Sequence, residues 1–460
     1  MNEVKERGGP IDPIAETVSE ARDATNDEIK SLPHVIDRVP PAAWAAALIG
    51  AWERFSYYCI ITIWQNYMQN KRGFHAVPGA LGLGQSTATA ISNGFFVFLF
   101  LTPTFFAIVS DTRLGRYRTL LSGLWFTNIA SLSSIPATFL EREYDFWTAY
   151  LMASGSLLLA IVMLLIFRPK LVKIVPHENN LPKAFRVLGV AARYGFKLDH
   201  AKQSYQTHHH GTDVPWSDSF VDELKRGLIA CRVIFSFAFF YLAITQMFNN
   251  LISQAGQMNL RRVPNDMIQA MSGVACVVFG PIIQALYNFL AKRRLSFGPM
   301  ARITVAFLMC GGGMAYASGL QKLIYSTGPC YDAPRDCPAS DGGRLPNDVN
   351  VWIQLPVYVA LAIAEIFGLV TASEYAYSKA PKDMRSIVQA MVQLSACIGA
   401  LMGMAISPAA RDPYLVIVYG TVAGVMGLCS ILFWWRFHKY DKIDQALNNS
   451  RDEESTSDGR

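Results

Sequence analysis

The chain has 460 residues, of which 52% are hydrophobic and only 17% are charged, and its formal net charge is +6. Soluble globular domains carry about 25% charged residues, so this composition and the long apolar runs exclude an ordinary soluble protein and indicate a polytopic membrane protein. The net charge is unremarkable for a membrane protein, whose lysines and arginines concentrate in loops on one side, so no nucleic-acid partner is expected.

Both ends of the chain are polar and contain few aromatic residues. Residues 1–41 and 437–460 lack the apolar surface that would offset the entropy cost of ordering, so we expect two disordered tails. Residues 1–38 contain no uninterrupted apolar segment followed by a small-residue cleavage site, so no secretory leader is expected. Insertion into the membrane would then depend on the first apolar span.

Ten membrane spans are predicted when each needs about 20 apolar residues. They are residues 42–64, 87–109, 118–139, 146–167, 227–249, 270–291, 299–325, 351–373, 385–408 and 414–435. With the N-terminus inside, one inside connection holds Arg113, Arg116 and Arg118, whereas the next outside connection holds Arg142. This asymmetry predicts that both termini are cytoplasmic.

A polar connection, 168–226, separates an N-terminal bundle of four spans, 42–167, from a C-terminal bundle of six spans, 227–436. Its segment PWSDSFVDELKRGL is typical of an amphipathic helix that enters the next span. The candidate start signals are Pro215, Ser217 and Asp218. We interpret the connection as a cytoplasmic linker on the membrane surface.

Histidines and cysteines suggest no cofactor. His208, His209 and His210 are adjacent, so they do not share a helical face as metal ligands would, and no metal site is predicted. Cys330 and Cys337 belong to CYDAPRDC in an outside connection, where an oxidising environment favours a disulfide. Two free thiols are the alternative.

Charges inside apolar spans are costly, so each one is a functional hypothesis. Glu53 and Arg54 lie in the first span, and the i, i+4 spacing places them over Tyr57 and Tyr58 on a helix. These four side chains would form a polar face. The alternative is that the two charges only neutralise each other and join two helices.

Three other polar features lie in the second half of the chain. Glu365 is deep in the eighth span with no basic residue within a turn, so it is either protonated or approached by a cation. Glu374 lies near Lys379 and Lys382 at the cytoplasmic end, where a gate ion pair and a solvated pair are both plausible. The amides in the fifth span serve equally well as packing contacts or as substrate contacts. These amides are Gln246, Asn249 and Asn250.

The residues carry a family resemblance. ERFSYY at residues 53–58 resembles the first-helix signature of the proton-dependent oligopeptide transporter family within the major facilitator superfamily, and AEIFGLVTASEYAYSKAPKDMRS at 364–386 is similar to its tenth helix. QNYMQ and PGALGLGQ look like the first connection of fungal members, and FNNLISQ at 248–254 is similar to the seventh helix. DTRLGRYRT, with Asp111, Gly115 and Arg116, resembles the superfamily's loop between helices two and three.

The resemblance implies a fold of twelve helices in two bundles and import of di- and tripeptides driven by protons. It implies that Arg54, Tyr57 and Tyr58 hold the peptide, with Arg54 near its carboxylate, and that Glu365 meets its amino terminus. Glu53 matches a proton-linked acid. Gln246, Asn249 and Asn250 remain candidate substrate contacts. The candidate gate or structural residues are Asp111, Gly115, Arg116, Glu374 and Lys382.

The chain also departs from the family pattern. Gly50 stands where the helix-one motif has a first Glu, Cys59 follows the tyrosine pair in place of Gly, and Phe106 replaces a Gly of helix two. Nothing resembles the fourth and fifth helices, including the segment whose Lys partners that first Glu, so about ten spans replace twelve. Either a degenerate paralogue or a gene model that lacks an exon explains this pattern, and both put proton coupling in doubt.

The leading prediction is a monomer in the plasma membrane that performs proton-coupled transport of di- and tripeptides or peptide-like metabolites. Its expected partners are small peptides, protons and the lipid bilayer. The alternative is a degenerate, non-transporting or altered-coupling paralogue that acts as a sensor or partner, or an exporter of a peptide-derived metabolite. An enzyme is not expected, because no nucleotide loop, metal-ligand spacing or nucleophile elbow is found.

Overall fold

The computed structural model of the chain describes residues 41–73, 77–110, 134–167, 180–195, 197–211, 214–293, 295, 297–341, 343–379 and 385–457. The chain divides into a unit Met1–Pro41 and a unit Ala42–Arg460, and the described helices belong to the second unit, with Pro41 as the first residue of α3. Within the described ranges, isolated β-bridges are the only strand-like pairings beside the helices. The predicted all-α fold class is therefore confirmed.

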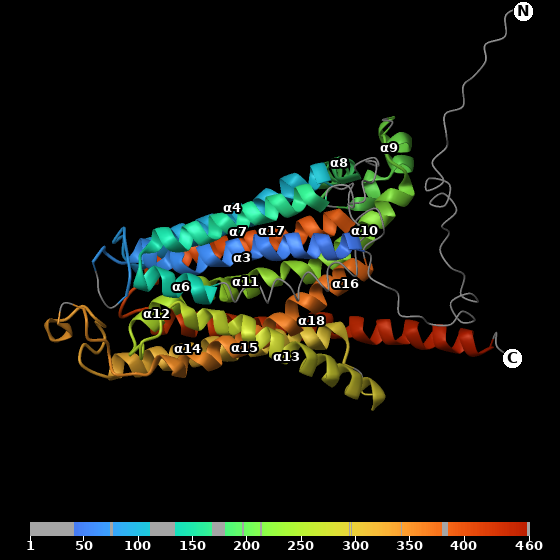
Figure 1. Cartoon of the computed structure of the whole chain (residues 1–460). Helices are drawn as coiled ribbons and strands as arrows, with labels where there is room; N and C mark the ends of the chain where they lie inside the picture. Colours follow the sequence, from blue (N-terminus) through green and yellow to red (C-terminus); the bar gives the residue numbers. More distant parts are fainter. Residues whose placement is uncertain are drawn as a thin grey trace, which may run out of the picture. The chain divides into compact units, whose positions relative to one another are not determined.

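The helices of this unit run lengthwise beside one another (Figure 1). The first half contains α3 Pro41–Gln69, α4 Gln85–Ser110, α6 Ser134–Glu143 and α7 Phe146–Phe167. The linker contains α8 Asn180–Arg193, η3 Leu198–Ala201 and α9 Gln203–His210. The second half contains α10 Asp218–Phe235, α11 Phe237–Thr245, η4 Gln246–Phe248, α12 Asn250–Gly256, α13 Met267–Lys292, α14 Pro299–Ser326, α15 Leu355–Glu365, η7 Ile366–Val370, α16 Thr371–Lys379, α17 Arg385–Ile406 and α18 Leu415–Ser457. Short 3-10 turns are η5 Pro338–Ser340, η6 Val351–Gln354 and η9 Ser407–Ala409.

Seven helical segments of the described chain are long and apolar enough to cross a membrane. They coincide with the seven predicted spans from residue 146 onward. A shorter apolar segment, Gln85–Leu101, lies in α4. α3 has 29 residues, enough to span, but carries Glu53 and Arg54. The predicted span 118–139 is described only from Ser134, as α6.

A tight turn connects α6 directly to α7. Tyr144 and Asp145 each donate a backbone hydrogen bond to Leu140 O, at 3.0 and 3.2 Å. The Asp145 carboxylate then accepts from the backbone N–H of Phe146 at 2.7 Å, as expected of a residue that caps a helix N-terminus. The two helices are therefore joined by a tight turn with no further helix between them.

The second half has an aromatic and small-residue core. Phe307 lies between Phe237 and Phe433 in this core, with ring centroids 5.5 and 5.4 Å from its own. A side chain at Gly311 of α14 would lie 3.2 Å from Met426 of α18, so this glycine allows the two helices to approach closely. α14 and α18 therefore pack closely against each other within the C-terminal bundle.

The C-terminal tail differs from the expectation. α18 continues as one helix to Ser457, although a disordered tail was expected from residue 437. Residues 437–457 contain no Gly or Pro that would end a helix. The start of the extension is also held in place, because the Asp441 carboxylate accepts from the backbone N–H groups of Met300 and Ala301 at 2.9 and 3.0 Å.

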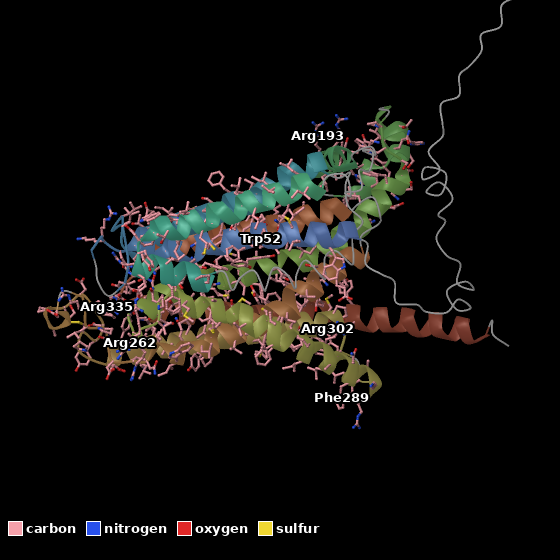
Figure 2. All side chains as sticks on the ribbon, viewed as in Figure 1. Trp52, Arg193, Arg262, Phe289, Arg302 and Arg335 are labelled. Carbon is pink, nitrogen blue, oxygen red and sulfur yellow. A yellow bond between two sulfur atoms is a disulfide. The ribbon has the colours of Figure 1, made fainter. Side chains whose placement is uncertain are left out.

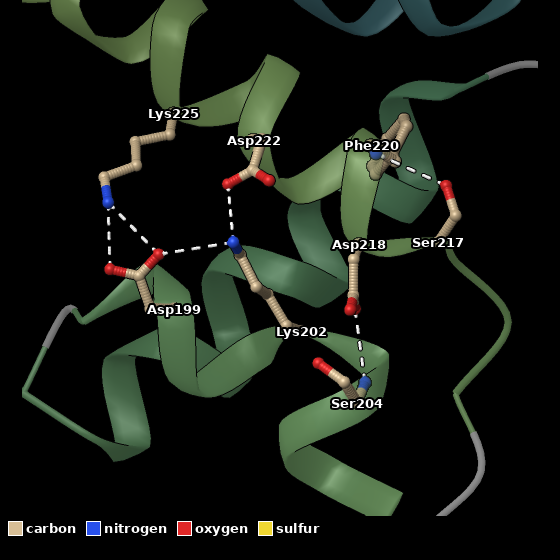
Figure 3. Close-up of polar contacts among 8 residues, drawn as sticks. All are labelled: Asp199, Lys202, Ser204, Ser217, Asp218, Phe220, Asp222 and Lys225. Atoms are coloured by element: carbon tan, nitrogen blue, oxygen red, sulfur yellow. Dashed lines mark hydrogen bonds and ion pairs between the residues drawn. The ribbon is translucent and has the colours of Figure 1, made fainter.

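The linker folds into a small helical unit with its own core, as Figure 3 shows for its polar contacts. Ser217 caps α10 by accepting from Phe220 N, so α10 starts at Asp218, where the sequence predicts. Trp216 is 7% exposed and donates its indole N–H to Ala201 O at 2.8 Å. Helices α8 and α9 were not predicted.

Candidate functional site

The predicted polar face of the first helix forms in α3. Arg54 donates to both carboxylate oxygens of Glu53, at 2.7 and 3.1 Å, and its guanidinium lies 5.1 Å from the ring centroid of Tyr57. The side chains of Arg54 and Glu53 are 39% and 46% exposed, so both reach solvent-accessible space in this conformation. The rings of Tyr57 and Tyr58 meet edge-to-face at 5.2 Å. Arg54 is thus neutralised by its neighbour and remains accessible to a ligand.

Tyr58 connects this face with the second half of the chain. Its hydroxyl lies within the electrostatic range of both Arg54 and Glu365. Glu365 is the last residue of α15, directly before the π-helical turn η7, and it also acts on Tyr241 of α11. π-Helical turns inside α-helices occur often at functional sites. Arg54 on α3 and Glu365 on α15 therefore both lie in the neighbourhood of Tyr58.

The amide cluster of η4 and α12 is buried in this conformation. Asn249 breaks the helix and caps α12 through its side-chain oxygen, which accepts from Asn250 N at 2.6 Å. The Asn250 amide donates to Gln246 at 2.7 Å and accepts from Thr89 of α4 at 3.0 Å. Gln246, Asn249 and Asn250 are each 0% exposed. Asn250 thus joins the two halves in this conformation, and Gln246 holds its side chain in place.

Similar polar contacts close one end of the two bundles. We call it the closed end: it is where α3 ends at Gln69 and α4 begins at Gln85. Thr62 donates to Gln269 at 3.3 Å, and Ser86 donates to Ser407 O at 2.8 Å. Figure 2 shows Arg262 and Arg335 toward this end and Arg193 at the other. Among the described residues, these polar contacts join the two halves at the closed end, and aromatic contacts such as Phe100 with Tyr241 join them further along. Glu53 and Arg54 of α3 reach solvent-accessible space.

The remaining predicted residues are placed as follows. Glu374 is exposed in the first turn of α16. Cys330 and Cys337 form a disulfide in the loop between α14 and α15. Asp111, Gly115, Arg116 and Lys382 lie outside the described residues.

Two buried residues at the closed end escaped the sequence analysis. Glu141 is 3% exposed and Asp266 is 0% exposed, although both residues lie in connections between the predicted spans. Their sequence neighbours Arg142, Glu143, Arg261 and Arg262 are polar and exposed, so no local signal marks the two carboxyl groups as buried.

Comparisons with known proteins identify the family. The model of the POT family matches residues 124–422. The chain is 40% identical over 423 residues to the peptide transporter imqD of Aspergillus flavus, covering 92% of this chain and 93% of that protein. It is 31% identical over 515 residues to the peptide transporter PTR_C of Candidozyma auris, covering 94% of this chain and 89% of that one. The chain belongs to the POT family of transporters, as the sequence motifs predict, and it is a multi-pass membrane protein.

Solved structures agree on the fold. The POT family transporter PepTSo superposes with a TM-score of 0.68 at 15% identity, covering 88% of this chain and 99% of that one. An auto-inhibited POT family peptide transporter superposes with a TM-score of 0.63 at 16% identity, covering 86% and 96%.

The alignments also locate the chain among long and short relatives. The 423 positions shared with imqD equal 92% of 460 residues, so almost no inserted segment separates the two chains. The alignment with PTR_C is 515 positions long but covers 94% of this chain, which is about 432 residues. About 80 positions of that alignment therefore have no counterpart in this chain. Eighty residues are about two helices with their connections. The shortened form therefore recurs in a second protein.

Proposed function

We propose that this chain transports di- and tripeptides across a membrane by alternating access, coupled to protons. The observation that carries the proposal is the pair of opposite charges, Arg54 on α3 and Glu365 on α15, which both act on Tyr58. A short peptide carries a carboxylate at one end and an ammonium group at the other. The two side chains would bind these ends and so select peptides by length, with Tyr57 and Tyr58 lining the space between them.

The arrangement of the bundles supports alternating access. Polar contacts join the halves at the closed end, whereas Glu53 and Arg54 remain accessible. Transporters of this architecture move two bundles around a central site. With the termini in the cytoplasm, the closed end faces outward and this conformation is inward-facing. We place the protein in the plasma membrane as a monomer, with Glu53 as a proton-linked acid.

The short chain does not weigh against transport. The relative imqD is named a peptide transporter and aligns without a long insertion. A shortened N-terminal bundle is thus no reason to assign this chain a sensor or partner role.

Uptake into proteoliposomes tests the proposal. The purified full-length chain is given a labelled dipeptide under an inward proton gradient. Glu365→Gln removes the charge that would face the peptide ammonium and should weaken binding by about 2 kcal/mol or more, about thirtyfold in KM. Glu143→Gln changes an exposed carboxylate at the end of α6 and should leave uptake unchanged. Absence of uptake by the native chain under every gradient contradicts transport.

A further inference from the structure

A carboxyl group from each half of the chain meets at the closed end. Glu141 lies in the last turn of α6, and Asp266 immediately precedes α13. The first is 3% exposed and the second 0% exposed, and their side chains are close enough to hydrogen-bond with each other. Both lie just beyond the ends of the apolar spans.

The oxygens of this pair receive few hydrogen bonds from other groups. Asn66 Nδ2 donates to Glu141 Oε1 at 3.4 Å, and Glu141 Oε2 has no donor among the described residues. The Asp266 oxygens have no donor in ordinary hydrogen-bond geometry, and only the backbone N–H groups of Asp266 and Met267 at the start of α13 lie near enough to act on them. An ionised carboxylate only accepts hydrogen bonds, so two ionised groups repel each other and leave these oxygens unsatisfied. One proton converts either group into a donor to the other, and the repulsion becomes an O–H···O bond.

The neighbouring groups supply no compensating positive charge. Tyr67 of α3 and Tyr150 of α7 lie on the side of Glu141, and Tyr358 of α15 lies on the side of Asp266. All three are phenols, which are neutral at physiological pH. In the described part of the chain, no lysine or arginine acts on the pKa of either carboxyl group or pairs with it. The amides of Asn66 and Asn265 bond to each other at 2.9 Å, and only Asn66 also reaches Glu141, at 3.4 Å.

We propose that Glu141 and Asp266 together bind one proton when the two bundles meet at the closed end, and release it when the bundles part. The pair is then a proton site distinct from Glu53 and from the peptide-contacting Glu365. Its place in a transport cycle rests on the proposed function. The binding of a shared proton does not, because it follows from the burial of two facing acids.

The direction of the pH dependence follows from linkage. Burial raises the pKa of Asp266 to about 7, and burial and the neighbouring carboxyl group raise the pKa of Glu141. When the bundles part, water reaches both groups and their pKa values return toward those of free carboxyl groups, about 4. The closed contact is therefore fully stabilised below about pH 4, and this stabilisation is lost as the pH rises through about 7.

Infrared spectroscopy tests the site without any transport measurement. The full-length chain in lipid nanodiscs is titrated across neutral pH, and the C=O stretch of protonated carboxyl groups is followed. We expect a band that disappears as the pH rises, that is lost in Glu141→Gln and in Asp266→Asn, and that persists in Glu143→Gln. If the band is unchanged in both Glu141→Gln and Asp266→Asn, the proposal is overturned.

A distance measurement tests the link with closure. Spin-labelled noncanonical amino acids at positions 71 and 411, which are exposed at this end on opposite halves, leave the cysteines intact. The distance between labels should lengthen with rising pH in the native chain. In Asp266→Asn it should stay short, because the amide donates to Glu141 at every pH. Equal pH dependence in both proteins contradicts the proposal, as does closure that requires added Ca²⁺ and is abolished by a chelator.

These outcomes are separable from failure of the proposed function. A native chain that takes up no peptide but shows the carboxyl band and the pH-dependent distance retains the proton site and loses only its role in transport. A native chain that takes up peptide but shows no band of a protonated carboxyl group couples transport to protons at another site.

Discussion

The side-chain amides of Asn66 and Asn265 each donate a hydrogen bond to the other, and both bonds are 2.9 Å long. Asn66 belongs to α3 and Asn265 to the turn before α13, so this reciprocal pair joins the two halves of the chain at the closed end. Both residues are almost completely buried, each 1% exposed. A buried amide whose partner is removed keeps its desolvation cost without the hydrogen bond.

We predict that Asn66→Ala destabilises the closed conformation by about 1 to 3 kcal/mol, because it leaves Asn265 Oδ1 unsatisfied. The thermal midpoint in detergent should fall. Adding Asn265→Ala should cost little more, since both partners are then absent and the two effects are not additive. Strictly additive shifts of the two single variants would show that the pair is not coupled.

Glycines in α17 allow it to approach its neighbours. A methyl group at Gly399 would lie 2.6 Å from both Ala238 O and Tyr241 Cβ of α11. The backbone oxygen cannot move aside as a flexible side chain would. A methyl group at Gly424 of α18, in contrast, would have nothing within 4 Å.

We therefore predict opposite effects for two identical substitutions. Gly399→Ala should cost about 1 to 3 kcal/mol through overpacking and reduce the amount of folded protein extracted from membranes. Gly424→Ala should be neutral or stabilising by up to about 1 kcal/mol, because Ala favours a helix over Gly. Fluorescence-detected size-exclusion chromatography after heating compares the two. Equal loss from both would contradict the prediction, because Gly424→Ala would then lose stability without any steric cause.

Local patterns explain which elements could be predicted. The range 146–167 was predicted as a span and is observed as α7, because an uninterrupted apolar run needs no tertiary information. The start of α10 was predicted from Ser217, whose capping hydrogen bond is local. The disulfide between Cys330 and Cys337 also spans only 7 positions.

Features built from distant residues could not be predicted. Glu141 and Asp266 are far apart in the sequence, and each lies in a segment that reads as a polar connection, so their meeting depends on how the two halves dock. The helical tail after Arg436 was missed because its composition resembles that of disordered segments, whereas Asp441 ties it to the start of α14. The polar cluster of Gln246, Asn249 and Asn250 was recognised, but the sequence does not reveal whether these amides face a cavity or a packed interface.

The linker unit offers a contrast between buried and exposed contacts. Lys202 pairs with Asp222 at 2.8 Å, and Lys225 pairs with Asp199 at 2.8 Å (Figure 3). The side chains of Lys225 and Asp199 are 49% and 58% exposed, so water and salt screen this pair. Trp216 is buried in the small core and carries an indole hydrogen bond.

We predict that Trp216→Ala opens the linker and Lys225→Ala does not. Loss of a buried Trp costs about 3 to 5 kcal/mol, which exceeds what a unit of this size is expected to tolerate. Limited proteolysis of the intact protein should cleave Trp216→Ala much faster near residues 180–217 and leave Lys225→Ala like the native chain. Rapid cleavage of Lys225→Ala instead would mean that the ion pairs hold the linker together.

Arg54 provides a direct test of peptide orientation. Its guanidinium binds Glu53 through two donors and lies over Tyr57, and a planar fork of this kind also matches a peptide carboxylate. Lysine keeps the charge but loses the fork. Arg54→Lys should therefore raise KM for a dipeptide about tenfold while changing its KM for the C-terminally amidated dipeptide little. The native chain should prefer the free acid over the amide, and the variant should lose most of this preference. Competition of the two peptides against labelled dipeptide uptake measures both ratios. If native chain and variant discriminate equally, Arg54 does not contact the carboxylate.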